Sequence, residues 1–334
     1  MQGSDLVLDI RSLRAILPGE AGPITLLDDV SLSVRAGETL AVVGESGSGK
    51  TMTFRCALGL APAAVHIAGG QVLLEGQDLT SLDAEAMRER RGATISMIFQ
   101  DPLTALNPVF TIGSQIAEVI RAHRRVGRSA ARALVIDVLR RVHIPDPARR
   151  IDDFPHQLSG GMRQRVLIAM AIALNPKMLI ADEPTTALDV TVQAQILELL
   201  AELRRESGMG MVLITHDLGL VARHADRVAV MYAGRVVETG TVDEVFARPL
   251  HPYTTALFRS IPSLEGAAAE MLPAIEGQPP MLADLPPGCA FAPRCFLGRD
   301  RTDCRTVRPP AEALVQGTHV SACLHANLLV VEAV

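Results

Sequence analysis

The sequence predicts an α/β fold: a mixed, largely parallel β-sheet with flanking helices. Short apolar runs such as LVLDI, TLAVV and KMLIAD alternate along the chain with stretches of helical character. Such alternation is typical of strand–helix–strand units, which place their strands parallel in one sheet. One run, TLAVV, leads directly into a glycine-rich segment and then a helical stretch, which is the strand–loop–helix context of a phosphate-binding loop.

The composition indicates a folded globular chain and excludes several classes of protein. The chain has 334 residues and a net charge of −5, which argues against binding to nucleic acid or to an anionic lipid surface. The arginines between Arg124 and Arg141 alternate with apolar residues at helical spacing, so we expect them on a solvated helix face. No apolar run reaches the ~18 residues of a membrane span, and the N-terminus lacks the pattern of a signal peptide. We therefore expect a cytosolic protein.

The character of the sequence changes twice along the chain. Residues 5–260 contain the alternating strands and helices, and within them residues 101–173 are mostly helical, as expected for a helical subdomain inserted between two halves of the sheet. Residues 261–334 are proline-rich and aperiodic, and they contain four of the five cysteines. Because this part has few apolar residues, we expect a small, loop-rich module that is held together through its cysteines.

The segment GESGSGKT, Gly44–Thr51, matches the phosphate-loop pattern G-x-x-x-x-G-K-[ST]. Glycines allow backbone N–H groups to turn toward an anion, and the N-terminus of the following helix adds partial positive charge. Lys50 is expected to reach the β- and γ-phosphates of a nucleotide, and Thr51 to help bind Mg²⁺. The nucleotide-binding residues predicted in this loop are Gly44, Ser46, Gly47, Gly49, Lys50 and Thr51.

A second apolar run, MLIADEP, ends in two adjacent carboxylates. We expect Asp182 to hold the water shell of Mg²⁺ and Glu183 to polarise the water that attacks the γ-phosphate. Adjacent residues on a strand point to opposite sides, so the two carboxylates can have different roles. Gln100 and His216 also follow apolar runs. Since the carboxyl ends of parallel strands meet at one edge of a sheet, all four side chains are candidates for one site.

The octapeptide LSGGMRQR, Leu158–Arg165, is the most specific motif in the chain. It resembles the signature motif of the ATP-binding cassette (ABC) ATPases. The motifs within residues 5–260 also follow the order of that family: phosphate loop, Gln100, LSGG, the LIADEP carboxylates, Asp189 and His216. The resemblance implies a P-loop ABC ATPase core that binds ATP and Mg²⁺ and hydrolyses ATP as a dimer.

The resemblance implies a role for the signature motif at the dimer interface. Ser159, Gly160 and Gly161 would close over the nucleotide that is bound by the opposite subunit. A serine hydroxyl, exposed N–H groups and a helix start form an anion site there. Asp189 would communicate across the same interface.

The resemblance also implies the catalytic roles. It assigns His216 to the γ-phosphate, and Gln100 to Mg²⁺, the attacking water and the coupling to a membrane partner. With the carboxylates, the expected catalytic residues are Glu183, His216 and Gln100, and the expected magnesium ligands are Thr51, Gln100 and Asp182.

One position departs from the family pattern. Members usually stack adenine on an aromatic side chain shortly before the phosphate loop, but no aromatic residue precedes Phe54 in this chain. Leu17 occupies the corresponding place. We expect an apolar contact between Leu17 and adenine, without the aromatic contribution of about 1 kcal/mol.

Further stretches resemble the dipeptide and oligopeptide (peptide/nickel) import branch of the family. They are FQDPLTALNP, DEPTTALDVTVQAQIL, YAGRVVETG, HPYTTAL, GQPP, PGCAFAPRC and HVSAC. The resemblance implies an ATP-hydrolysing subunit that powers uptake of di- or oligopeptides or related small solutes. Its implied partners are a second, related ABC ATPase in a heterodimer, two integral membrane permeases and an extracytoplasmic substrate-binding protein. The implied location is peripheral, on the cytoplasmic face of the cell (inner) membrane.

Four cysteines, Cys289, Cys295, Cys304 and Cys323, are separated by five, eight and eighteen residues. Disulfides are disfavoured in the cytosol, and the residues alone leave an iron–sulfur cluster, a zinc ion and unligated thiols open. Paired C-x2-C knuckles, which are common in zinc sites, are absent, and the longer uneven spacing suits a wider cluster. The resemblance also favours [4Fe–4S], for which we expect a structural role. Cys56 lies outside this group and is expected in the core.

A nucleic-acid-associated ABC ATPase of the repair or translation type is the alternative function. Repair ATPases need long insertions inside the cassette, and translation factors need two cassettes in one chain. This chain has one cassette, no long insertion and a weakly acidic charge, so we expect no nucleic-acid partner. A redox sensor centred on the cysteines is a third possibility, which no further feature of the sequence supports.

Overall fold

The computed structural model describes residues 5–20, 22–100, 105–186, 188–260, 275–312 and 314–329. Residues 101–104 of the predicted helical subdomain, and residues 261–274, 313 and 330–334 of the predicted C-terminal module, lie outside this part. The chain divides into two compact units. The first contains Met1–Leu8, Val34–Thr39 and Leu74–Leu213, and the second contains Asp9–Ser33, Leu40–Leu73 and Ile214–Val334. No helix in the described ranges is long and apolar enough to cross a membrane.

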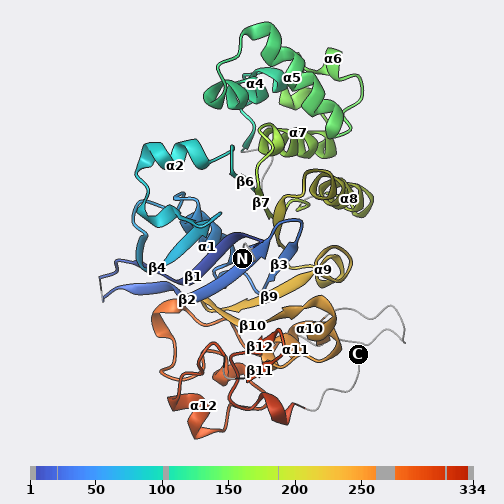
Figure 1. Cartoon of the computed structure of the whole chain (residues 1–334). Helices are drawn as coiled ribbons and strands as arrows, with labels where there is room; N and C mark the ends of the chain where they lie inside the picture. The colour runs from blue at the N-terminus through green and yellow to red at the C-terminus, as the bar shows by residue number, and fades with distance from the viewer. Residues whose placement is uncertain are drawn as a thin grey trace. The chain divides into compact units, whose positions relative to one another are not determined.

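In the first unit, the described residues of the range predicted for the helical subdomain include four helices that gather together (Figure 1). They are α4 (Ile112–His123), α5 (Arg128–Arg141), α6 (Pro147–Arg150) and α7 (Gly160–Ile172). Helix α4 buries isoleucines at 112, 116 and 120, one turn apart, which gives it a single apolar face. Helix α5 buries Ala131, Val135, Val138 and Leu139 and leaves its arginines near the surface. The arginine-rich stretch is thus a solvated helix face, as its spacing predicts.

The first unit also contains two parallel strands that end beside each other. β6 (Ile95–Ile98) pairs with β7 (Met178–Asp182), and Ile98 lies opposite Ala181. All five residues of β7 are buried, so this strand is covered on both faces. Its nearly continuous apolar sequence follows from that position. The other elements of this unit are β5 (Gln77–Asp78), α2 (Ala84–Arg90), α8 (Val190–Ser207) and nearly all of β8 (Gly210–Ile214).

The sheet of the second unit is mixed. β3 (Thr39–Val43) pairs in parallel with β9 (Arg227–Tyr232), which pairs antiparallel with β10 (Arg235–Thr241). The C-terminal region extends this sheet, because β12 (His319–Ser321) pairs antiparallel with β10 and β11 (Leu314–Gln316) pairs with β12. Strands β2 (Ile24–Arg35), β1 (Leu6–Leu17) and β4 (His66–Leu74) are neighbours in that order in another sheet. The helices are α1 (Lys50–Ala57), α9 (Leu218–His224), α10 (Val242–Ala247), α11 (Pro252–Arg259) and α12 (Thr302–Thr306).

The described C-terminal residues share a hydrophobic core with the rest of the second unit. Phe291 and Cys295 are buried in the same cluster as Val230, Tyr253 and Phe258. This cluster supplies the apolar burial that the C-terminal sequence lacks by itself. The burial of Cys56 at the end of α1 agrees with the expected core position of that residue.

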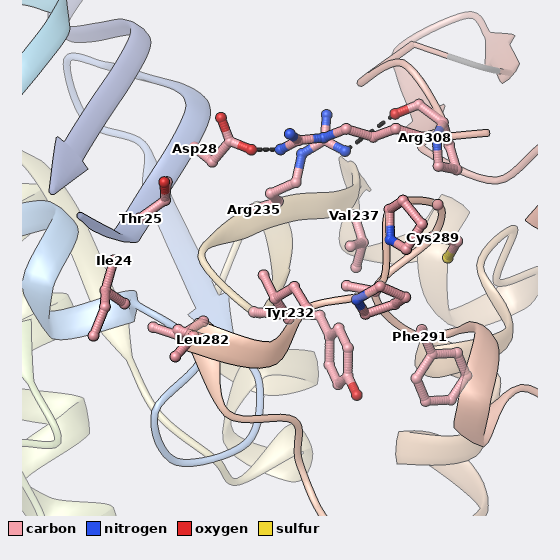
Figure 2. A pocket seen from close by; sticks show the side chains of 18 of the residues that line it. Ile24, Thr25, Asp28, Tyr232, Arg235, Val237, Leu282, Cys289, Phe291 and Arg308 are labelled. Atoms are coloured by element: carbon pink, nitrogen blue, oxygen red, sulfur yellow. Dashed lines mark hydrogen bonds and ion pairs between the residues drawn. The ribbon is translucent and has the colours of Figure 1, made fainter. Parts of the chain in front are cut away.

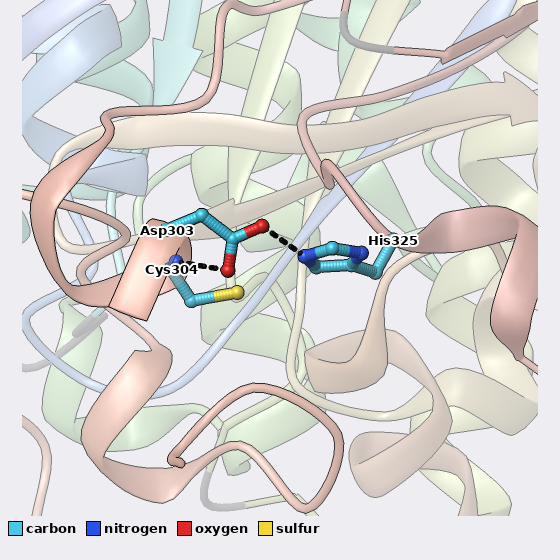
Figure 3. A group of neighbouring side chains, drawn as sticks. All are labelled: Asp303, Cys304 and His325. Atoms are coloured by element: carbon cyan, nitrogen blue, oxygen red, sulfur yellow. Dashed lines mark hydrogen bonds and ion pairs between the residues drawn. The ribbon is translucent and has the colours of Figure 1, made fainter. Parts of the chain in front are cut away.

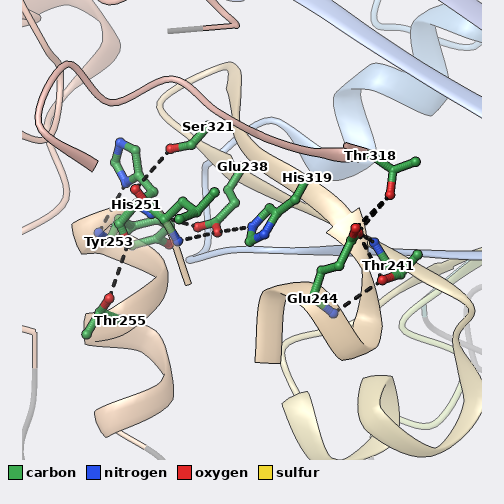
Figure 4. Close-up of polar contacts among 10 residues, drawn as sticks. Glu238, Thr241, Glu244, His251, Tyr253, Thr255, Thr318, His319 and Ser321 are labelled. Atoms are coloured by element: carbon green, nitrogen blue, oxygen red, sulfur yellow. Dashed lines mark hydrogen bonds and ion pairs between the residues drawn. The ribbon is translucent and has the colours of Figure 1, made fainter. Parts of the chain in front are cut away.

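A buried carboxylate ties the C-terminal strands to β10 and α11 (Figure 4). Glu238 is 1% exposed. Its Oε1 accepts the N–H of Leu250 at 2.6 Å and lies 2.7 Å from His319 Nε2. Its Oε2 accepts the N–H of His251 at 3.0 Å. The Nδ1 of His251 accepts the N–H of Tyr253 at 3.1 Å, at the start of α11. Two backbone N–H groups donate to this buried carboxylate, and hydrogen bonds to a carboxylate are among the stronger ones in proteins.

Candidate functional site

The segment Gly44–Thr51 forms the loop between β3 and α1 in the second unit. Gly44 has φ +148°, and a Cβ there would lie 2.2 Å from the carbonyl oxygen of Met231, so this position requires glycine. Ser46 and Gly47 are exposed on the loop, and Gly49 ends it in the left-handed region at φ +104°. The loop therefore has the tight backbone that the phosphate-loop pattern predicts.

Three groups on this loop fit a phosphate group. Lys50 is 7% exposed, and its ammonium donates to the carbonyl oxygens of Gly44 at 2.8 Å and Glu45 at 2.9 Å, so it lies across the loop. Helix α1 begins at Lys50, and its N-cap residue, Gly49, provides no side-chain cap. The buried Ser48 hydroxyl has no hydrogen-bond partner among the described residues. An ammonium, uncapped helical N–H groups and an unpartnered hydroxyl are the donors that bind a nucleotide phosphate.

Two of the predicted catalytic side chains meet in the first unit. Gln100 follows β6, and its Nε2 donates to Glu183 Oε2 at 2.8 Å. The Thr186 hydroxyl donates to the same oxygen at 2.9 Å. Asp182, the last residue of β7, is 2% exposed. The parallel pairing of β6 and β7 brings these residues together, as expected for the carboxyl edge of a parallel sheet.

Glu183 has an unusual backbone conformation. Its φ is +45°, in the left-handed region that residues with a side chain rarely adopt. Such a conformation costs on the order of 1–3 kcal/mol and is concentrated at functional sites. The turn after β7 therefore holds the Glu183 carboxylate in a fixed direction, with two donors on one of its oxygens.

The signature motif and Asp189 lie side by side in the first unit. Ser159 caps α7 by accepting the N–H of Met162 at 3.3 Å, and Asp189 caps α8 by accepting the N–H of Val192 at 3.0 Å. A Cβ on Gly161 would lie 2.7 Å from Val192 Cγ1, so the start of α7 packs on the start of α8. Gly160 is exposed. The capping bond uses the Ser159 oxygen as an acceptor, and its O–H remains available to donate to a ligand.

His216 is exposed and lies between β8 and α9 in the second unit. The preceding residue, Thr215, donates its N–H to the carbonyl of Val42 in β3 at 3.3 Å, so His216 emerges beside the strand that leads into the phosphate loop. Leu17 ends β1 and is half-buried. The predicted residues are thus divided: Lys50, Thr51 and His216 belong to the second unit, and Gln100, Asp182, Glu183, Ser159 and Asp189 to the first.

One residue of the phosphate loop, Glu45, is not among the residues that the sequence predicts for the site. Its carboxylate forms a two-pronged ion pair with Arg294, which lies 249 residues further along the chain. Its N–H donates to the Tyr253 hydroxyl at 2.8 Å. The only sequence signals are an acidic residue inside GESGSGKT and an arginine directly before Cys295. Neither residue indicates that the other is its partner, because an ion pair between residues far apart in the chain leaves no periodic pattern in the sequence.

A cavity of about 790 Å³ lies elsewhere in the second unit, between the β1–β2 loop and C-terminal residues (Figure 2). Arg308 pairs with Asp28 at its rim, and Arg235 donates to the carbonyl of Pro309 at 3.1 Å. Burial lowers the pKa of the Arg235 guanidinium. None of the residues 44–51 lines this cavity, so it is distinct from the phosphate loop.

Comparisons with known proteins agree with these motifs. Residues 27–186 match the family model for ABC transporters, and residues 237–304 match the model for the oligopeptide/dipeptide transporter C-terminal region. The chain is 50% identical over 290 residues to the dipeptide transport ATP-binding protein DppD of Bacillus subtilis, covering 86% of both chains. It is 50% identical over 289 residues to the oligopeptide transport ATP-binding protein OppD of Bacillus subtilis, covering 86% of this chain and 81% of that protein.

The fold agrees with a solved structure. A dimeric bacterial ABC transporter cassette superposes with a TM-score of 0.63 and 28% sequence identity, covering 70% of this chain and 98% of that chain. The predicted P-loop ABC ATPase fold, with its mixed sheet and flanking helices, is thereby confirmed. The chain belongs to the ABC transporter ATPase family, and within it to the members that carry the oligopeptide/dipeptide transporter C-terminal region.

Proposed function

We propose that this chain is the ATP-hydrolysing subunit of an importer for di- or oligopeptides or related small solutes. The observation that supports this most strongly is the combination, in one chain, of all the ABC ATPase motifs with the oligopeptide/dipeptide transporter C-terminal region. The two Bacillus subtilis relatives are named for transport of dipeptides and oligopeptides. These similarities extend over 86% of the chain, so they include at least part of the C-terminal region as well as the ATPase core.

The side chains described above have separate roles in ATP hydrolysis. Lys50 exchanges its two carbonyl acceptors for oxygens of the β- and γ-phosphates, and the loop N–H groups donate to the same anion. Glu183 accepts a proton from the attacking water, and Gln100, bonded to the Glu183 carboxylate, orients that water. His216 donates to the γ-phosphate. Thr51, Asp182 and Gln100 would hold Mg²⁺, which when bound neutralises charge on the phosphates.

A dimer completes the nucleotide site. Gly160 is exposed at the start of α7, and Val190, directly after Asp189, is 83% exposed. This face suits contact with a second cassette, and the solved relative is a dimer. In such a dimer Ser159, Gly160 and Gly161 face the nucleotide of the partner cassette. We propose that the partner is a related but different ABC ATPase, so that the pair is a heterodimer.

The membrane partners would dock on another part of the first unit. Val109 is 71% exposed and Phe110 is 53% exposed, between Gln100 and α4. Exposed apolar residues in such a group suit a helix from another protein. We propose that the segment from Gln100 to Ile116 receives the short cytoplasmic helix of a permease, one of two integral membrane permeases that work with an extracytoplasmic substrate-binding protein. The chain would then lie peripherally on the cytoplasmic face of the membrane.

The proposed function predicts peptide-dependent ATP hydrolysis by the assembled transporter. The chain, its partner ATPase and the two permeases are reconstituted in liposomes, and the phosphate released from ATP is measured with the binding protein empty or loaded with peptide. The loaded binding protein is expected to raise the rate several-fold, because closure of the ATPase dimer is coupled to the permeases. Equal rates with the empty and the loaded binding protein would contradict peptide import.

We propose, further, that Cys289, Cys295, Cys304 and Cys323 hold a [4Fe–4S] cluster. All four thiols are free, and burial together with neighbouring thiols raises the pKa values of Cys289, Cys304 and Cys323. Burial raises the pKa of the Cys304 thiol to about 11 and that of Cys323 to about 12. Thiols with such pKa values remain protonated and unreactive unless a metal displaces the proton.

The backbone around the sulfurs supports a ligated group. The N–H of Gly298 donates to Cys295 Sγ at 3.1 Å. A Cβ on Gly298 would lie 3.0 Å from Cys304 Sγ and 3.3 Å from Cys295 Sγ, so only glycine allows the backbone this close to both. When bound, the cluster would cross-link this loop-rich region.

A single zinc ion is the alternative to a cluster in this region. Four thiolates on one tetrahedral zinc lie roughly 3.8 Å apart, because each Zn–S bond is ~2.3 Å. In the described ranges, one group of three side chains could bind a metal ion, because its ligand atoms lie within 4.8 Å of one another. These side chains are Asp303, Cys304 and His325 (Figure 3). His325 Nε2 lies 2.7 Å from Asp303 Oδ2. That mixed set would be the alternative zinc site, with one cysteine only.

The cluster proposal predicts a coloured protein. Purified without oxygen, the full chain is expected to absorb in the visible region and to contain about four irons per chain. Replacing Cys295 by Ser should remove most of the iron and the colour. Replacing Cys56 by Ala, outside the group, should leave both unchanged. A colourless chain with one zinc that is lost in the variant His325→Ala would show instead that the mixed set binds zinc.

A further inference from the structure

Arg294 is a residue of the C-terminal region whose buried side chain bonds to residues of the ATPase core. Its side chain is 6% exposed. Its two terminal nitrogens donate to the Glu45 carboxylate: Nη1 to Oε2 at 2.7 Å and Nη2 to Oε1 at 3.0 Å. Nη1 also donates to the Tyr232 hydroxyl at 3.3 Å, and Nε donates to the carbonyl of Glu276 at 2.9 Å. A planar guanidinium that makes two parallel bonds to one carboxylate fixes both distance and orientation.

Glu45, on the other side of this ion pair, is the second residue of the phosphate loop. Its N–H donates to the Tyr253 hydroxyl, and its carbonyl accepts from Lys50 and from the N–H of Ser48 at 3.2 Å. The backbone and the side chain of Glu45 are therefore all engaged. Three of these contacts hold the loop from inside the ATPase core, and the Arg294 contact comes from the C-terminal region.

An aromatic cluster holds Arg294 in this position. Phe291 packs edge-on against Tyr232, with the ring centroids 5.2 Å apart, and at a tilt against Tyr253, with the centroids 5.3 Å apart. The guanidinium lies 5.9 Å from the centroids of both Tyr232 and Phe291. Figure 2 shows Tyr232, Cys289 and Phe291 on neighbouring segments beside the cavity. Cys289 and Cys295 flank the segment that contains Phe291 and Arg294.

We infer that Arg294 is a positioning residue of the ATP site: the C-terminal region neutralises the carboxylate of Glu45 and holds the phosphate loop in the form that binds nucleotide. This rests on the assignment of Gly44–Thr51 as the ATP-binding loop. It gives the cysteine-bearing region a second purpose beyond its own folding, because ATP affinity then depends on that region.

Arg294 is expected to affect ATP binding through the electrostatics of the phosphate loop. An ATP-binding loop collects N–H groups and an ammonium around a polyanion, and a free carboxylate in the same loop opposes the phosphates. Paired with a guanidinium that water reaches poorly, the Glu45 carboxylate contributes little net field at the loop. Without Arg294 the negative charge is restored, and the side chain of Glu45 loses its fixed orientation.

The test is a charge-neutralising double-mutant cycle on the full chain. The dissociation constant of Mg²⁺–ATP is measured for the wild type, Arg294→Gln, Glu45→Gln and the double variant. Arg294→Gln is expected to weaken ATP binding by about tenfold to a hundredfold, because it leaves Glu45 unpaired. The double variant is expected to recover to within about threefold of the wild type, because the opposing charge is gone.

Two further variants separate this role from simple folding. Arg294→Lys retains the charge without the two-pronged geometry, so its affinity should lie between those of the wild type and Arg294→Gln. Arg299→Gln removes an exposed arginine that pairs with Glu276 at 3.4 Å in the same region, and its affinity should be that of the wild type. The thermal midpoint of each variant without nucleotide reports loss of folding separately.

The outcomes decide the inference. Unchanged ATP affinity in Arg294→Gln, or a double variant as weak as Arg294→Gln, would overturn it, since the arginine would then serve only to anchor the C-terminal region. Wild-type chain that binds no ATP would refute the ATP site itself, which is a different failure. Recovery in the double variant is the result that supports the inference.

Discussion

Glu183→Gln is expected to lower ATP hydrolysis by about 10²–10⁴-fold while ATP binding is retained. The glutamine has nearly the same shape and can still contact Gln100 and Thr186, which both donate to Glu183 Oε2 in the native chain. It cannot accept a proton from the attacking water. The variant should therefore accumulate as an ATP-bound closed dimer, which size-exclusion chromatography with Mg²⁺–ATP detects alongside a phosphate-release assay.

Two variants serve as controls for this prediction. Lys50→Ala should fail at the earlier step, with weak ATP binding and no stable dimer, because it removes the ammonium from the phosphate loop. Glu85→Gln removes an exposed carboxylate that pairs with Arg88 in the same unit, and it should hydrolyse ATP at the native rate. Native turnover by Glu183→Gln in the presence of the partner ATPase would show that another group is the base.

His251 is expected to make the fold sensitive to mild acid. Burial lowers the pKa of His251 to about 3, from an ordinary value of 6.5. Below 6.5 the unfolded chain binds a proton at this residue that the folded chain does not bind, so stability falls as the pH drops from 6.5 toward 3. Between pH 7 and pH 5, this one residue should remove about 2 kcal/mol of unfolding free energy.

The variant His251→Asn isolates this contribution. Asparagine caps helices well, and its side-chain oxygen can accept the N–H of Tyr253 that His251 Nδ1 now accepts. The unfolding midpoint of the variant should change less between pH 7 and pH 5 than that of the wild type. His66→Asn, at an exposed position, is the matched control and should retain the native pH dependence. Equal pH dependence of the wild type and His251→Asn would refute the proposed role of the buried imidazole.

The nucleotide-site motifs could be read from the sequence because each is local. In the phosphate loop, neighbouring residues perform one task, and the positive φ of Gly44 is a local backbone conformation that favours glycine. The pairing of β6 with β7 follows from two apolar runs, and it brings Gln100 to Glu183 as the sheet-edge argument predicts. The positive φ of Glu183 was not predictable, because a glutamate has no intrinsic preference for that region.

The long-range contacts of the C-terminal region could not be read from the sequence. The sequence predicts a loop-rich module with little core, whereas the structure places Phe291 and Cys295 in a core shared with residues of β3, β9, α9, α10 and α11. It also pairs β12 with β10 through a buried glutamate, Glu238. A single acidic residue within YAGRVVETG gives no indication that its side chain is buried, because that depends on a histidine 81 residues away.

The central claim is that this chain hydrolyses ATP in order to drive peptide import. It is tested most directly by the rate of ATP hydrolysis in the reconstituted transporter as peptide-loaded binding protein is added. We expect the rate to rise with loaded binding protein and to fall to the background level when the chain contains Glu183→Gln. A rate that is indifferent to peptide, or a peptide response that survives Glu183→Gln, would contradict the account.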